Sequence, residues 1–125
     1  MEGWNVRIDK DLVAASATPL VLAILAEGES YGYALLKRIR ELSDGELDWT
    51  DGMLYPLLHR LGRLGYVTTE WRASPEGRKR RYCVITDAGR AALAEQQRQW
   101  ATVTRALGGV WGGHFRLPSI TPATA

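Results

Sequence analysis

Three side chains in the stretch 50–64 have the types and the spacing to read the edges of nucleic-acid bases. Tyr55, His59 and Arg63 follow one another at intervals of four residues, so a helix would bring them onto one face. They offer hydrogen-bond donors and positive charge, which suit the acceptor groups in the major groove of DNA. The opposite face is apolar and carries the leucines at positions 54, 57, 58, 61 and 64. An ordinary amphipathic surface helix would show the same two faces, and Tyr55 could be a packing residue.

A second group of residues has the chemistry to bind phosphate. The segment 72–81 holds five basic residues and one acid, whereas the whole chain has a net charge of only +2. The positive charge is therefore concentrated in one place, as it is in proteins that contact a nucleic-acid backbone. Arg78, Lys79 and Arg80 are the strongest candidates, and each of them could instead be a solvated surface charge.

Further residues complete the predicted DNA-binding set. Gly52 would allow the backbone to approach closely, and the first turn of the helix would direct its N–H groups at a phosphate. Tyr31 and Lys37, on a preceding helix, are additional candidates for phosphate contacts. The whole set is Tyr31, Lys37, Thr50, Gly52, Tyr55, Pro56, His59, Arg60, Arg63, Arg78, Lys79 and Arg80.

Catalytic and metal-binding chemistry find little support in the sequence. His59 and His114 are far apart in the chain, and Cys83 lies in a predicted strand without a nearby base. No glycine-rich phosphate loop and no paired-carboxylate site is recognisable. A single cysteine excludes an internal disulfide framework and a cysteine-rich metal site. We therefore expect no enzyme, no metal and no cofactor.

The bulk properties of the chain indicate one small cytoplasmic domain. A length of 125 residues corresponds to about one domain, and its apolar content of 46% can build only a small core, which a partner chain would enlarge. The first ten residues are polar and charged, so we expect no signal sequence. The longest apolar run, around residues 19–26, is too short to cross a bilayer, and we expect no membrane partner.

The N-terminal part of the chain is predicted to form two helices. In the first, residues 9–27, Pro19 either kinks one long helix or begins a second one after Thr18. Ser30 is predicted to cap the next helix, over residues 31–42. The inward positions of that helix are Leu35, Leu36, Ile39 and Leu42.

The central part is predicted to form a third helix and a hairpin. Thr50 is the predicted N-cap of this helix, and Pro56 should distort its first turns because proline lacks a backbone donor. Gly65 ends the helix. Two strands, 66–73 and 80–85, then flank a turn that carries the basic cluster.

The C-terminal part is predicted to form one long helix. Thr86 caps it, and it should end near Leu107, before the glycine pairs at 108–109 and 112–113. A helix of this length on so small a domain needs something to pack against, and a second copy of the chain is the simplest answer. Trp111 and Phe115 fall in the tail, where the pattern predicts no definite place for them.

The order of these elements predicts a mainly α fold with a two-stranded β-wing, which is a winged helix-turn-helix plus a C-terminal dimerisation helix. The predicted divisions are a flexible N-terminus (1–8), a winged helix-turn-helix DNA-binding domain (9–85), the dimerisation helix (86–107) and a partly disordered tail (108–125). A winged helix used only for contacts with other proteins is the alternative, since a fold does not fix a function.

Motifs along residues 10–107 resemble those of the PadR-like transcriptional regulators, in particular the short subgroup with one C-terminal helix. The order and spacing of the motifs carry the resemblance more than any one of them. The matching segments are 25–28, 31–33, 54–56, 60–61, 65–66 with Trp71, 77–82 and 85–89. Cys83 departs from the pattern, because the family often has a second aromatic residue after Tyr82; only the local packing of the strand is in doubt.

The chain looks most similar to the multidrug-binding PadR-like repressors, and this resemblance implies an effector site. In those proteins a tryptophan of the last helix lies at the centre of the dimer, and Trp100 stands at the corresponding place. A homodimer formed through the long C-terminal helix would set two recognition helices about one turn of DNA apart, roughly 34 Å, and so predicts a palindromic operator. The resemblance implies a planar aromatic or cationic ligand between the subunits. Trp100 could equally be a simple interface anchor. The implied lining is Leu12, Ala15, Pro19, Leu22, Ala23, Gln96, Trp100 and Thr104.

Overall fold

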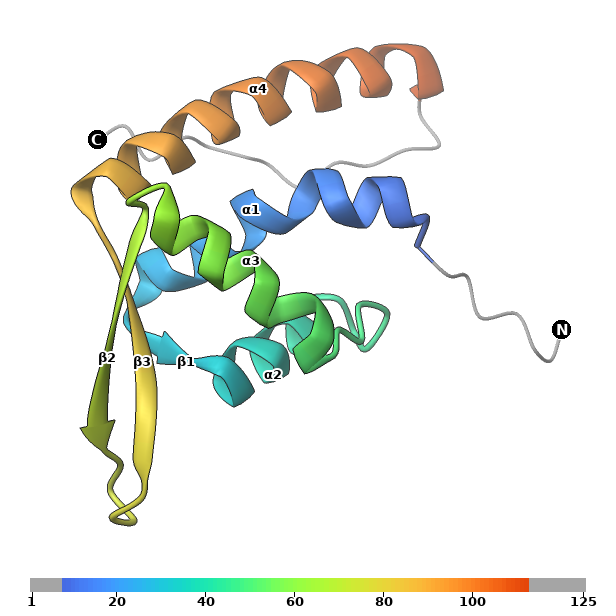
Figure 1. The fold of residues 1–125 in the computed structure, drawn as a ribbon. Coiled ribbons are helices and arrows are strands. Elements are labelled where there is room, and N and C mark those ends of the chain that lie inside the picture. Colours follow the sequence, from blue (N-terminus) through green and yellow to red (C-terminus); the bar gives the residue numbers. More distant parts are fainter. Residues whose placement is uncertain (1–7, 113–125) are drawn as a thin grey trace, which may run out of the picture.

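The computed structural model of the chain describes residues 8–112, which form four α-helices and a small antiparallel sheet. Figure 1 shows α4 crossing above α1, while the hairpin of β2 and β3 extends away from the helices. This confirms the predicted mainly helical fold with a β-hairpin between the third and last helices. In chain order the elements are α1 (Lys10–Glu27), β1 (Ser30–Tyr31), α2 (Gly32–Leu42), α3 (Asp51–Arg63), β2 (Val67–Ala73), β3 (Lys79–Ile85) and α4 (Asp87–Trp111).

The sheet has a third strand that the sequence pattern did not predict. Its order is β1-β3-β2, and β1 pairs antiparallel with β3 through Ser30 opposite Cys83 and Tyr31 opposite Tyr82. Ser30 is therefore a strand residue, and its predicted role as a helix cap is wrong. Helix α2 begins one residue later than predicted, and Tyr31 occupies the N-cap position without a side-chain bond to the helix.

The core lies where α1, α2 and α3 meet the base of the sheet, and one turn of α4 closes it. The leucine stripe of α3 is buried as predicted except for Leu64, which is 54% exposed because the helix ends at Arg63. Leu42, at the end of α2, is also exposed rather than inward. The buried apolar residues are Val21, Leu22, Ile24, Leu25, Leu35, Ile39, Trp49, Leu54, Leu57, Leu58, Leu61, Val67, Cys83, Ile85 and Leu93.

Two prolines lie inside helices without ending them. Helix α1 is one continuous element through Pro19, which settles the choice between one helix and two. Helix α3 likewise runs through Pro56, so the distortion expected there does not interrupt it. A proline removes one backbone hydrogen bond. Each helix is also held by burial of its apolar face, with Leu22 beside Pro19 and Leu57 beside Pro56, and tertiary packing of this kind stabilises helices more than propensity does.

Helix α4 begins as predicted and ends later than predicted. Thr86 caps it, because its hydroxyl oxygen accepts from the Gly89 N–H at 3.0 Å. The helix continues through Gly108 to Trp111, and Gly112, with a φ of +70°, follows it. The predicted end at Leu107 is wrong, because glycine lowers helix stability by only about 1 kcal/mol and does not bar the helix sterically.

Several expectations fall on residues outside the described range. The flexible N-terminus was expected over 1–8, of which only Ile8 is described, and the end of the tail, with Phe115, lies beyond residue 112. Trp111 belongs to the last turn of α4. Among residues 8–112, no helix is long and apolar enough to pass through a bilayer.

Candidate nucleic-acid interface

The outward face of α3 presents the predicted base-reading side chains to solvent. Tyr55 is 50% exposed, and His59 and Arg63 are exposed on the following two turns. The Nδ1 of His59 and a guanidinium nitrogen of Arg63 are 3.5 Å apart. The remaining predicted residues of this helix and of its start are also exposed, namely Thr50, Gly52, Pro56 and Arg60.

The start of α3 has the backbone geometry expected of a helix N-terminus. The carbonyl oxygen of Thr50 accepts from the N–H groups of Met53 and Leu54, at 3.0 and 3.1 Å. The Thr50 hydroxyl makes no capping bond, so the predicted position of the cap is confirmed and its side-chain bond is not formed. N–H groups at a helix start that no side chain caps remain available to an anion.

Tyr55 also contacts the preceding helix. Its hydroxyl group lies against the α-carbon of Gly32, where a methyl group would come within 2.5 Å of the phenol oxygen. One edge of Tyr55 therefore packs on α2 while half of its surface remains open. The structure supports the packing role that the sequence left as an alternative, and it keeps the ring on the exposed face of α3.

A cleft of 810 Å³ separates α3 from the hairpin. Its walls bring together side chains that are distant in the chain, including Tyr55, His59 and Arg63 from α3 and Thr69 and Arg81 from the strands. None of the described residues that line it is acidic. The cleft therefore offers donors and positive charge to a ligand rich in acceptors.

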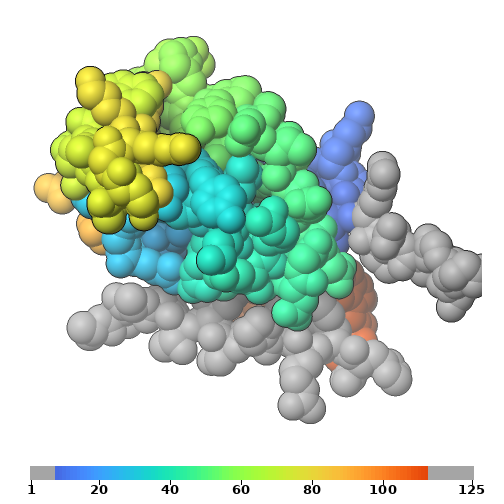
Figure 2. All heavy atoms as spheres, turned by 90° about the horizontal axis from the view of Figure 1, so that it is seen from below, coloured from blue at the N-terminus to red at the C-terminus, as the bar shows by residue number. Residues whose placement is uncertain are grey.

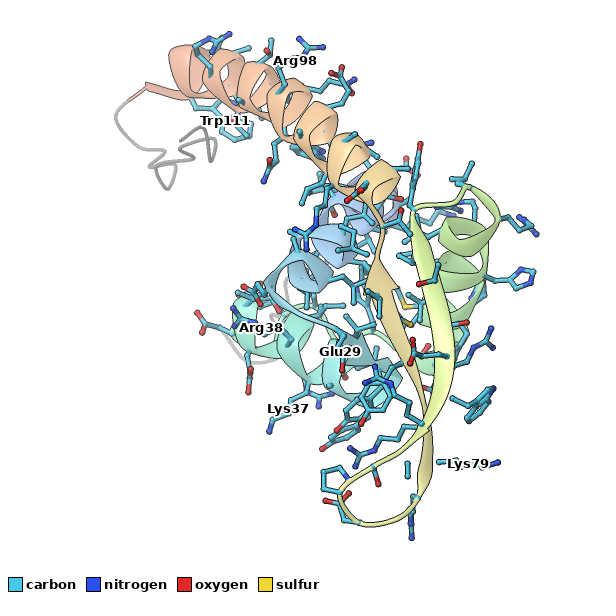
Figure 3. The ribbon with its side chains drawn as sticks, turned by 90° about the vertical axis from the view of Figure 1, so that its left-hand side faces the viewer. Glu29, Lys37, Arg38, Lys79, Arg98 and Trp111 are labelled. Carbon is cyan, nitrogen blue, oxygen red and sulfur yellow. The ribbon has the colours of Figure 1, made fainter. Side chains whose placement is uncertain are left out.

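The turn of the hairpin is a tightly bonded loop. The buried Ser74 accepts the Arg78 N–H on its hydroxyl at 3.1 Å, and its own N–H donates to the Arg78 carbonyl at 2.6 Å. Gly77 takes a φ of +88°, which glycine adopts at little cost. Arg78 and Lys79 are exposed beyond this turn, and within residues 8–112 neither forms an ion pair. Figure 3 shows Lys79 projecting from the hairpin on the side where α3 lies.

Arg80 and Tyr31, both predicted to contact phosphate, are engaged with each other. The Arg80 guanidinium lies 4.2 Å from the centre of the Tyr31 ring and forms an ion pair of 3.1 Å with Glu76. Tyr31 in turn meets Tyr82 edge to face, with ring centres 5.6 Å apart. These contacts join β1 to the hairpin, so both side chains have a structural role that the sequence did not indicate.

A second arginine continues this cluster. The Arg72 guanidinium lies 4.2 Å from the centre of the Tyr82 ring and forms ion pairs with Glu29, at 2.8 Å, and Glu70, at 3.0 Å. Hydrogen bonding to Arg72, with its positive charge, holds the pKa of Glu29 below its ordinary value of 4.5. Glu29 lies just beyond Gly28, the C-cap of α1, so the cluster ties the end of α1 to the hairpin. Sequence reasoning missed Arg72, Tyr82 and Glu29, because none has a local motif that signals the contact.

The third predicted phosphate contact, Lys37, is exposed on α2. It lines a shallow hollow of 510 Å³ together with Tyr33, an exposed tyrosine that the predicted set omitted. Figure 2 shows that α2, α3 and the hairpin tip lie next to one another on a single face of the molecule. The predicted DNA-binding residues are thus gathered on neighbouring elements.

The residues implied for an effector site divide into two groups. On α4, Gln96, Trp100 and Thr104 are half-buried at intervals of four residues, and the Thr104 hydroxyl donates to the Trp100 carbonyl at 2.8 Å. On α1, Leu12 and Ala15 are exposed and Pro19 and Ala23 half-buried. Leu22 is completely buried in the core, so its side chain is not open to a ligand on the surface of one chain.

The distal half of α4 carries an apolar seam. Trp100, Val103, Leu107 and Val110 follow at spacings of three, four and three residues, which is the heptad pattern of paired helices. Val103 is 49% and Val110 84% exposed, and the last buried apolar side chain of α4 is Leu93. Trp100 and Leu107 are half-buried, so the seam is covered only in part by the described residues. Within the same range, no three His, Cys, Asp or Glu side chains group as metal ligands would.

Comparisons with known proteins agree with this architecture. The sequence model of the Transcriptional regulator PadR-like family matches residues 21–95. The Transcriptional regulator Rv3488 of Mycobacterium tuberculosis is 40% identical over 90 residues, which cover 71% of this chain and 80% of that protein. A PadR-like transcriptional regulator from Bacillus cereus superposes with a TM-score of 0.75 at 28% identity, covering 82% of this chain and 98% of the other.

A PadR family transcriptional regulator from Eggerthella lenta is similar at 32% identity and a TM-score of 0.67, covering 83% of this chain and 88% of the other. The family match, the level of identity and the shared fold thus point the same way: this chain belongs to the PadR-like family of transcriptional regulators.

Proposed function

We propose that this chain is a ligand-responsive repressor that binds a palindromic DNA site as a homodimer. One arrangement supports the proposal above all. The exposed face of α3, with Tyr55, His59 and Arg63, lies across an acid-free cleft from the hairpin. A helix of this kind fits the major groove of DNA, and an adjacent basic hairpin fits the sugar-phosphate backbone.

The proposed contacts differ in kind along this face. His59 and Arg63 would donate to acceptor groups on base edges, and Tyr55 would contact bases with the edge that α2 leaves open. Arg60, Lys37 and the N–H groups after Thr50 would bind phosphates, where Gly52 lets the backbone approach. A protein with these contacts would act on chromosomal DNA in the cytoplasm.

The hairpin residues differ in how readily their side chains could bind DNA, because some of them already contact other residues of the protein. Arg78 and Lys79 are exposed at the tip and free to reach a phosphate or the minor groove. Arg80 and Tyr31 would have to leave their contact with each other before binding DNA directly. We therefore propose Arg78 and Lys79 as the principal contacts of the tip.

The homodimer is supported by the seam on α4. Burial of Trp100, Val103, Leu107 and Val110 against a second copy would remove apolar surface from water, which is the main driving force for such pairing. A two-fold axis between the copies would place two recognition helices about one turn of DNA apart, roughly 34 Å, and so select a palindromic site.

The effector site is proposed at this same interface. Trp100 and its copy would enclose a planar aromatic or cationic ligand, with Gln96 and Thr104 from α4 and Leu12, Ala15, Pro19 and Ala23 from α1 around it. The small side chains on α1 leave room for such a ligand. A ligand of this type changes DNA affinity only if it binds one arrangement of the two subunits better than another.

A gel-shift experiment on the DNA upstream of the gene tests the proposal. We expect a salt-sensitive shift of that DNA, release by planar cationic aromatic compounds, and higher expression of a reporter when the protein is absent. A protein that shifts no duplex at low salt would instead be a module for protein contacts. Activation of the reporter by the protein would contradict the proposed repression but not the proposed DNA binding.

Dye binding followed by fluorescence anisotropy separates the two roles of Trp100. We expect Trp100→Ala to lose dye binding while Trp71→Ala, a change of an exposed tryptophan on the hairpin, retains it. Equal dye binding by both variants would leave Trp100 as an interface anchor only.

A further inference from the structure

The register of the hairpin separates its arginines onto two faces. Neighbouring residues of a strand point to opposite sides of the sheet, and Arg80 and Arg81 are neighbours in β3. Arg80 pairs across the strands with Arg72, whereas Arg81 pairs with Trp71. Arg72 and Arg80 thus share one side of the sheet, and Arg81 lies on the other side together with Lys79.

The side that carries Arg80 is already neutralised. Arg80 forms its ion pair with Glu76, and Arg72 lies between Glu29 and Glu70. Two arginines therefore meet three carboxylates, and the rings of Tyr31 and Tyr82 cover the two guanidinium groups. This face would repel a phosphate more than attract one.

The side that carries Arg81 has the opposite character. Arg81 is exposed and lines the cleft with His59 and Arg63, where none of the described lining residues is acidic. Arg81 forms no ion pair within residues 8–112. Lys79, two residues earlier in the strand, projects toward the side of α3 in Figure 3, as the alternation requires.

We propose that Arg81 binds a backbone phosphate inside the cleft, between the recognition helix and the wing, and that Arg80 is a positioning residue that holds the wing against β1. This inference rests on the proposed DNA-binding function and assigns the inner side of the sheet to it. Its geometric basis is that the outward face of α3 and the side of the sheet that carries Arg81 form the two walls of one cleft. A DNA strand lying beside α3 would therefore pass Arg81 before it reaches the tip of the hairpin. Trp71, opposite Arg81 and 64% exposed, presents an apolar ring beside that path.

The salt dependence of DNA binding distinguishes the two arginines. Each phosphate contact contributes about 0.9 to the slope of log K against log salt. We expect Arg81→Gln to weaken binding to specific and random duplexes alike and to lower the slope by about one. Arg81→Lys should restore the slope, because a phosphate accepts a point charge. Arg80→Gln should weaken DNA binding without changing the slope of log K against log salt. In this variant the backbone amides of β1 should also exchange hydrogen faster than in the wild type.

Arg90→Gln is the matched control, since Arg90 is an exposed arginine on α4, away from the cleft. It should change neither affinity nor slope. A wild-type slope in Arg81→Gln, or a loss of slope in Arg80→Gln that Arg80→Lys restores, would overturn the assignment while the proposed function stands. Failure of the wild-type protein to bind any duplex would overturn both.

Discussion

The phenol oxygen of Tyr55 on α3 lies against the bare α-carbon of Gly32, the first residue of α2. A methyl group at position 32 would lie 2.5 Å from that oxygen and 3.1 Å from the ring carbon that bears it. This contact is one of the places where the proposed recognition helix meets the helix before it. It also links the position of Tyr55, which we propose contacts bases, to a residue that touches no DNA in the proposed complex.

The first prediction follows from this contact. Gly32→Ala should push the Tyr55 ring outward, because the obstructing atoms belong to the end of a side chain that can rotate. We expect stability to change by less than about 1 kcal/mol, and affinity for the specific DNA site to fall by about 1 kcal/mol or more, as for the loss of one base contact. Thermal unfolding and DNA titration measure the two effects. Unchanged affinity, with Tyr55 shown to have moved, would remove Tyr55 from the contact set.

A second prediction concerns Gly89, in the first turn of α4. A methyl group there would overlap the carbonyl oxygen of Tyr66 and lie 2.8 Å from Cγ1 of Ile85. The Tyr66 carbonyl accepts the Thr86 N–H and cannot easily move. We expect Gly89→Ala to lower the free energy of unfolding by about 1–3 kcal/mol in denaturant titrations at fixed protein concentration.

Gly109→Ala in the same helix provides the control. No described atom lies within 4 Å of the added methyl group, and alanine favours a helix over glycine by about 1 kcal/mol. This variant should therefore be slightly more stable than the wild type. Equal destabilisation by both substitutions would mean that steric overlap with Tyr66 and Ile85 is not the cause of the loss of stability in Gly89→Ala.

The fold was largely predictable because its signals are local. The cap at Thr86 and the left-handed glycine after α3, Gly65 with a φ of +82°, each follow from a few neighbouring residues. Strand β1 was not predictable, since its two residues are extended only because Ser30 and Tyr31 pair with Cys83 and Tyr82, which are distant in the chain. The end of α4 was misjudged because two glycines weaken a helix without stopping it.

The candidate site was predictable in composition and less so in geometry. The charge of the segment 72–81 is visible in the sequence. Which of Arg80 and Arg81 faces the cleft and which contacts β1 depends on the register of β3 and on the distant Tyr31. The burial of Leu22 likewise depends on how three helices meet. Neither property is encoded in the neighbouring residues.

A third prediction concerns the pH dependence of the Glu29–Arg72 ion pair. The folded-state pKa of Glu29 is lowered from 4.5, so the pair contributes stability above the unfolded pKa and loses it as the pH falls through the folded pKa. We expect Arg72→Met to bring the pKa of Glu29 back up toward 4.5 in a carboxyl-carbon NMR titration. Arg90→Gln should leave the titration as it is in the wild type. No change in Arg72→Met would show that another group sets this pKa.

A fourth prediction tests the seam on α4. The wild-type protein should sediment with twice the mass of one chain. Val103→Glu should sediment as a single chain, because a carboxylate in an apolar interface must be stripped of water without a partner. Thr102→Glu, one residue away on the same helix and off the seam, should remain a dimer. Dimeric Val103→Glu would move the interface elsewhere.

The most direct test of the central claim, that α3 and the hairpin together form a DNA-binding face, is the salt dependence of duplex binding by the wild type and by the double variant Arg78→Ala, Lys79→Ala. We expect the wild-type log K to fall linearly with log salt, and the double variant to bind every duplex more weakly with a slope smaller by about two. A double variant that keeps the wild-type affinity and slope, or a wild-type protein that binds no duplex at low salt, would contradict the account.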